Sequence, residues 1–112
     1  MNLFEHIARF FGNADTVAAE SRHWKLLKSA EELEDIKQSS HQKAQVIYKH
    51  STRCSVSYMA MQEMRKSVDE YKGTISFHLV DVIGDRQLSR FIADELSVRH
   101  ESPQLIILKD GA

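Results

Sequence analysis

The hydrophobic and polar positions of the chain follow two alternating periods, which predict strands and helices in turn. Short apolar runs rich in β-branched and aromatic residues are typical of strands. Apolar residues spaced three or four apart are typical of helices that bury one face. The predicted strands cover residues 24–27, 44–49, 74–82 and 102–108, and a helix lies between each pair. After a leading helix, the order is therefore β-α-β-α-β-α-β, which predicts an α/β fold with helices on both faces of a sheet.

The helices between these strands carry recognisable ends and buried faces. Ser29, followed three positions later by Glu32, has the spacing of a capping box, in which each side chain bonds the other's backbone region. Gly73 is expected to end the long second helix. The residues expected to face the sheet are Met61, Met64, Val68 and Tyr71 in the second helix, and Leu88, Phe91, Ile92 and Leu96 in the third.

The first 22 residues form a region of their own. Residues 3–11 place Leu3, Ile7, Phe10 and Phe11 at helical spacing, and the polar stretch 13–22 is typical of a linker. This amphipathic helix either packs on its own domain or docks on a partner. We therefore expect an N-terminal helix and linker over 1–22 and one domain over 23–112, a suitable size for a single core.

Composition excludes several classes of function. The net charge is −1, with 15 basic and 16 acidic residues, so nucleic acid is not expected as the main partner. No apolar stretch approaches the ~20 residues of a membrane span. The six histidines show no spacing typical of a metal site, so we predict neither a metal nor a bound cofactor.

Cys54, the only cysteine, is the main candidate for chemistry. A single cysteine forms no internal disulfide, which favours a reducing compartment and a cytoplasmic location. Cys54 stands where a strand passes into a helix, and the amides of a helix N-terminus stabilise a thiolate. Arg53 adds a positive charge beside it. The alternative is a buried and inert thiol.

Two further positions bear on this thiol. Ser57 stands three residues after Cys54, where a C-x-x-C enzyme has its second cysteine. A serine hydroxyl can donate a hydrogen bond to the thiolate but forms no disulfide, so a mixed disulfide on Cys54 needs a thiol from another molecule. Pro103, the only proline, opens the last strand.

Two separated segments resemble a known family. Residues 49–57 read KHSTRCSVS and residues 99–104 read RHESPQ, and both are similar to motifs of the monothiol bacilliredoxins, the YtxJ-like proteins. The resemblance covers about residues 23 to 112. It implies a thioredoxin-like fold with a mixed four-stranded sheet. It also implies that Cys54 removes bacillithiol, the co-substrate, from bacillithiolated or oxidised client proteins, and that the Ser102–Pro103 bond beside the thiol is cis.

The chain departs from this family in two places. Ser55 replaces the usual proline, which leaves the first helical turn less constrained. The sequence also stops soon after the last predicted strand, so the last strand and helix of the fold are expected to be missing. The strand at 105–108 would then have an open edge, through which a homodimer is possible.

The sequence leaves alternative functions open. The first is thiol–disulfide exchange through Cys54, with Arg53, Ser57, Ser102 and Pro103 in support. The second is a redox-silent thioredoxin-like binding module, since a second cysteine is missing. An iron–sulfur carrier is the third and least favoured, because the segment 54–57 lacks the glycine and phenylalanine of monothiol glutaredoxins.

Overall fold

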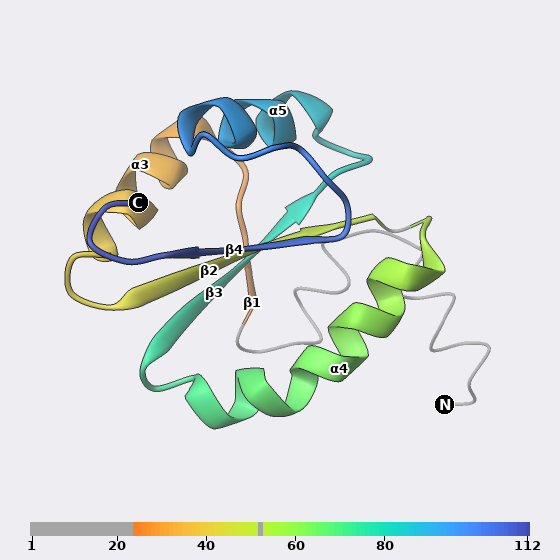
Figure 1. Cartoon of the computed structure of the whole chain (residues 1–112), viewed down its shortest axis with the longest axis horizontal. Helices are drawn as coiled ribbons and strands as arrows, with labels where there is room; N and C mark the ends of the chain where they lie inside the picture. The colour runs from red at the N-terminus through yellow and green to blue at the C-terminus, as the bar shows by residue number, and fades with distance from the viewer. Residues whose placement is uncertain (1–23, 52) are drawn as a thin grey trace.

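The computed structural model describes residues 24–51 and 53–112. The leading helix at 3–11, its linker and the boundary at residue 22 lie outside the described residues. The predicted order of seven elements is confirmed (Figure 1). They are β1 (Trp24–Leu26), α3 (Ala30–Ser39), β2 (Ala44–His50), α4 (Ser55–Tyr71), β3 (Ile75–Asp81), α5 (Arg86–Glu95) and β4 (Gln104–Leu108).

The four strands form one mixed sheet in the order β1-β3-β2-β4. β3 runs parallel to both β1 and β2, whereas β4 pairs with β2 in the antiparallel sense. The chain leaves β2 and β3 at one end of the sheet and enters β4 at that same end, where Lys49 lies opposite Gln104. The segment that begins α4 and the segment that precedes β4 therefore meet at one end of the sheet.

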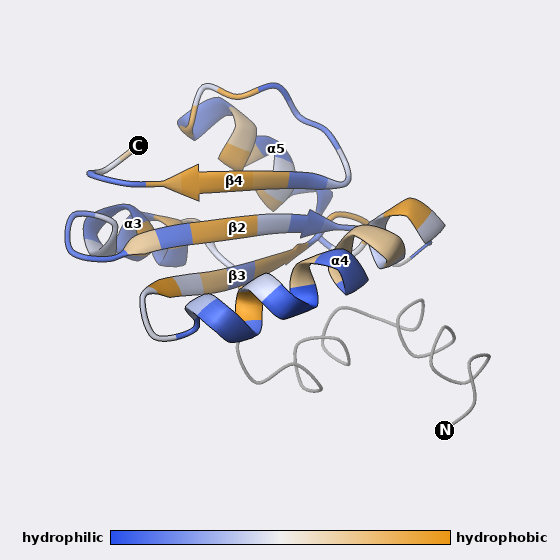
Figure 2. Ribbon diagram, turned by 60° about the horizontal axis from the view of Figure 1, so that its bottom comes forward, coloured by the Kyte–Doolittle hydropathy of each residue, from blue (hydrophilic) through white to orange (hydrophobic). Residues whose placement is uncertain are grey.

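Helices cover both faces of this sheet, as predicted, and each face has its own apolar core (Figures 1 and 2). The face under α4 buries Trp24, Val46, Tyr48, Met61, Val68, Phe77 and Leu79. The face under α3 and α5 buries Leu27, Leu33, Ile36, Ile47, Val80, Leu88, Ile92, Ile106 and Leu108. Neighbouring residues of a strand point to opposite faces, so β2 contributes to both cores.

Two residues expected in the buried stripes are exposed. Phe91 is 39% exposed because successive helical residues point about 100° apart. Its neighbour Ile92, which is fully buried, takes the position against the sheet. Tyr71 is 46% exposed and is the last residue of α4, where the chain already turns towards β3.

The predicted helix ends are largely confirmed. The hydroxyl of Ser29 accepts the Glu32 N–H at 3.2 Å, while the Glu32 carboxylate accepts the N–H of Lys28, one residue before the cap. Asp85 caps α5 by accepting the Leu88 N–H at 3.1 Å. α4 ends at Tyr71 as expected, but Gly73 does not adopt the positive φ of a glycine cap.

β4 lies at the edge of the sheet and, within the described residues, pairs only with β2. Leu105 and Ile107 lie opposite Tyr48 and Val46, which face α4, so they point to the same side of the sheet, and they are 46% and 63% exposed. Figure 2 shows that β4 is largely hydrophobic. The homodimer through this edge stays a prediction, which the mass of the protein in solution would test.

In the described part of the chain, no helix combines the length and apolar character that crossing a bilayer requires.

Two isoleucines offer a direct test of this packing. Ile92→Ala should lower the free energy of unfolding by about 2–5 kcal/mol, because Ile92 is fully buried and its loss leaves a cavity. Ile107→Ala is the matched control: its side chain is 63% exposed, and the change should cost less than about 1 kcal/mol. Urea titration measures both, and equal losses would contradict the core described here.

A buried histidine gives the fold a pH dependence. His78 is 9% exposed, and its Nε2 lies 2.8 Å from Oε1 of Gln45. Burial, together with the charge of Lys25, lowers the pKa of His78 to about 4. The pKa of His78 in the unfolded chain is about 6.5. As the pH falls below this value, His78 binds a proton in the unfolded chain but not yet in the folded chain.

Stability should therefore decrease between about pH 6.5 and pH 4, by on the order of 3 kcal/mol from this group. Urea titrations at several pH values measure the loss. The control variant His78→Gln should show a shallower decrease over the same range. An equally steep decrease in the variant would mean that other groups cause it.

Candidate functional site

Cys54 lies at the N-cap of α4, four residues after β2 ends. The turn between them is closed by a backbone hydrogen bond from the Cys54 N–H to the Ser51 carbonyl, at 3.2 Å. The first turn of α4 then begins with the Tyr58 N–H bonded to the Cys54 carbonyl. The thiol is half-buried and forms no disulfide. The predicted position at a strand-to-helix junction is therefore confirmed.

The first turn of α4 lowers the pKa of the Cys54 thiol. The backbone N–H of Ser57 has the largest effect, and the Val56 N–H and the Ser57 side chain add to it, while partial burial acts in the opposite direction. These amides have no partner within the helix, so they are available to a thiolate. The arrangement favours the ionised, nucleophilic form of the sulfur.

Ser57 is fully buried, and hydrogen bonds hold it in place from two sides. Its hydroxyl oxygen accepts the Ser51 N–H at 3.3 Å, which leaves its own proton available for the sulfur of Cys54. Its carbonyl accepts the hydroxyl of Tyr48 at 2.8 Å. Ser57 thus joins the end of β2, the turn and the first turn of α4 in one network.

Tyr48, on β2, stabilises this network through its hydrogen bond to the Ser57 carbonyl. The ring is 2% exposed, and burial, with the nearby Cys54 charge, raises the pKa of the Tyr48 phenol to about 12. The phenol therefore stays protonated and remains a donor to the Ser57 carbonyl. His50, also fully buried, lies beside it with the ring centres 5.8 Å apart.

Arg53 is exposed, and the groups that lower the pKa of Cys54 belong to the first helical turn. The expectation that Arg53 acts on the thiol stays a prediction. Thr52, the residue before it, lies outside the described residues.

The segment before β4 contains the Ser102–Pro103 peptide bond, which is cis as the family resemblance implied. Gln104 closes this segment into a compact loop: its amide donates to the Arg99 carbonyl at 2.7 Å and its oxygen accepts the Glu101 N–H at 3.4 Å. The loop lies at the same end of the sheet as Cys54 (Figure 1). That Ser102 faces the thiol stays a prediction.

Sequence reasoning missed a pair of basic residues at this end. Lys49, on β2, is fully buried, and its ammonium lies 3.0 Å from Nδ1 of His100 in the 99–103 loop. Both residues belong to the two segments that resemble the bacilliredoxin motifs, KHS and HES, but no sequence spacing shows that they meet. In the regions 24–51 and 53–112, His, Cys, Asp and Glu side chains form no group of three that could hold a metal.

Comparisons with known proteins agree with this geometry. The sequence model of a family described as "Monothiol bacilliredoxin BrxC" matches residues 25–112. A solved protein described as an oxidoreductase with a thioredoxin fold is 28% identical, with a TM-score of 0.71 over 80% of this chain and 77% of its own. The thioredoxin of Malassezia sympodialis is 25% identical, with a TM-score of 0.61 over 78% and 70%. The thioredoxin of Trypanosoma brucei, at 22% identity and a TM-score of 0.62 over 79% and 71%, shares the fold.

Replacing Ser57 tests the network around the thiol. Ser57→Ala should raise the pKa of Cys54, because it removes the hydroxyl that helps to stabilise the thiolate but keeps the backbone N–H. The rate of alkylation against pH should therefore shift to higher pH, while most exchange activity remains. Ser55→Ala, an exposed change in the same turn, is the matched control. If the alkylation rate of Ser57→Ala had the same pH dependence as that of the wild type, the Ser57 hydroxyl would not contribute to stabilising the thiolate.

Proposed function

Because this chain belongs to the monothiol bacilliredoxin family, we propose that it removes bacillithiol from protein mixed disulfides through Cys54. The observation that carries the proposal is the half-buried thiol at the start of α4, whose pKa is lowered by the Ser57 and Val56 amides. A stabilised thiolate is both the attacking group in exchange and a good leaving group when it is reset.

The proposed reaction has two exchange steps, each of which conserves electrons. First, the Cys54 thiolate attacks the bacillithiol sulfur of the mixed disulfide, the new Cys54–bacillithiol disulfide forms, and the client leaves as a thiolate. Second, the thiolate of another bacillithiol, or of a partner protein, attacks the bacillithiol sulfur of this disulfide, forms a new disulfide with that bacillithiol and releases the Cys54 thiolate. Ser57 has no sulfur to offer, so no internal disulfide competes with the second step.

The partners proposed for this reaction are bacillithiolated or oxidised client proteins and the small thiol itself. Bacillithiol acts as a co-substrate and not as a resident cofactor. We propose the cytoplasm as the location, because a single reactive thiol of this kind needs a reducing pool for its second step.

Mass spectrometry of the intact protein tests the reaction. Incubation with a bacillithiolated client peptide should add one bacillithiol to the protein and release the peptide as a thiol. Adding reduced bacillithiol should then restore the original mass. Cys54→Ser should show neither change, because it removes the nucleophile.

A protein that keeps its original mass, with a thiol that resists labelling while folded, would instead support the binding-module alternative. If the client peptide itself became attached to Cys54, the thiolate would have attacked the client sulfur and not the bacillithiol sulfur. It would contradict the proposed removal of bacillithiol while leaving thiol exchange intact.

A further inference from the structure

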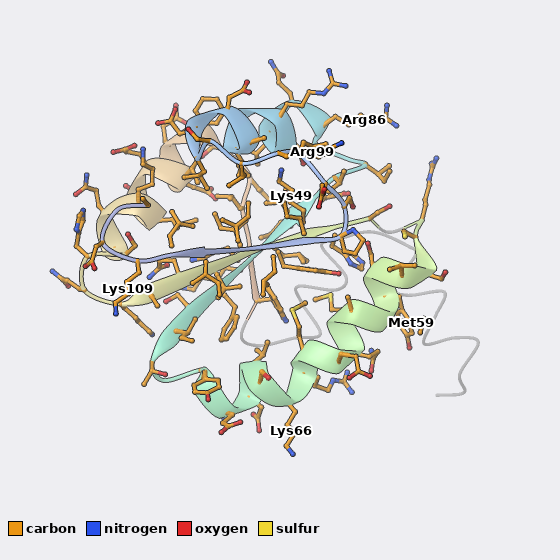
Figure 3. The ribbon with its side chains drawn as sticks, viewed as in Figure 1. Lys49, Met59, Lys66, Arg86, Arg99 and Lys109 are labelled. Carbon is orange, nitrogen blue, oxygen red and sulfur yellow. The ribbon has the colours of Figure 1, made fainter. Side chains whose placement is uncertain are left out.

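The pair formed by Lys49 and His100 has no part in the network around Cys54, yet it lies at the same end of the sheet. Lys49 is on the α5 side of β2, since it alternates with Tyr48, which faces α4. Figure 3 shows Lys49 beneath α5, whereas Lys109 lies at the far end of β4. His100 is exposed and lies two residues before Ser102.

The charge of Lys49 is unusual in its setting. The side chain is fully buried, and its contact is an imidazole and not a carboxylate. By contrast, Lys37 pairs with the carboxylates of Glu34 and Glu95, and Lys72 pairs with that of Asp69. A buried ammonium without an anionic partner is costly, so the place attracts negative charge.

The contact with Lys49 bears on the tautomer of His100, and burial lowers the pKa of Lys49. An ammonium has three donors and no acceptor, so while Lys49 is protonated Nδ1 of His100 accepts from it. The proton of the neutral ring then sits on Nε2, which is left as a donor on an exposed residue. Burial, then the charge of Lys49, then that of Arg90, which is exposed on α5, lower the pKa of His100.

We propose that the Nε2–H of His100, oriented by the buried ammonium of Lys49, binds a carboxylate of the small thiol that exchanges at Cys54. This inference rests on the proposed function and adds the recognition of the thiol to it. In this account His100 contacts the ligand, and Lys49 is a positioning residue.

Two small symmetric disulfides separate recognition from reactivity. Dithiodipropionate carries a carboxylate on each half, whereas bis(hydroxyethyl) disulfide is neutral. With either, the Cys54 thiolate forms a mixed disulfide with one half and releases the other half as a thiolate. The rate constants are measured by mass spectrometry, and their ratio, anionic over neutral, reports on the proposed site.

His100→Ala and Lys49→Met should each lower this ratio about three- to ten-fold, while the rate with the neutral disulfide stays within about two-fold of wild type. Lys109→Met removes the same charge at the far end of β4 and should leave the ratio unchanged. The ratio of the wild type should also fall as salt is added, because salt screens the attraction of the Lys49 and Arg90 charges for a carboxylate.

Unchanged ratios in His100→Ala would overturn this proposal while leaving the reactive thiol in place. A wild-type protein that reacts with neither disulfide would overturn the proposed function itself. If Lys49→Met does not fold, as judged by circular dichroism, the exposed changes His100→Ala and Arg90→Gln decide the question.

Discussion

The stabilisation of a thiolate by the first turn of a helix is the interaction on which the site depends. The amides of Val56 and Ser57 lower the pKa of Cys54 only if the start of α4 holds its position against the sulfur. That position is secured by two hydrogen bonds to Ser57, one from the Tyr48 hydroxyl and one from the Ser51 N–H. Since both partners lie in or just after β2, the sheet itself sets the environment of the thiol.

β2 is suited to this task because of its place in the sheet. It pairs with β3 on one side and β4 on the other, and its side chains enter both apolar cores. Its last residues are therefore fixed by burial on both faces, and the turn that follows carries Cys54 at a defined point. The antiparallel β4 adds the loop with the cis Ser102–Pro103 bond at the same end. The reactive group and its surroundings thus come from segments about 45 residues apart in the chain.

Membership of the monothiol bacilliredoxin family gives the lone cysteine a chemical consequence. Ser57 occupies the place where a second thiol would resolve a mixed disulfide internally, and here it serves to stabilise the thiolate. The chemistry proposed for Cys54 then needs an external thiol, and the basic pair of Lys49 and His100 offers a physical reason for preferring an anionic one.

The order of strands and helices, the junction at Cys54 and the capping residue Ser29 were determined by the sequence alone, because they depend on local spacing and on hydrogen bonds within a few residues. The cis bond at Pro103 was expected only through the family resemblance, since X–Pro bonds are usually trans. Three features were decided by the tertiary structure: the strand order, the bond between Tyr48 and Ser57, and the contact between Lys49 and His100. The last of these joins residues that are 51 positions apart. A lysine in a predicted strand is normally expected to be exposed, but α5 and the 99–103 loop pack over β2 and bury Lys49. Such contacts arise from how elements pack, and hydrophobic periodicity reports which face of an element is buried but not what lies against it.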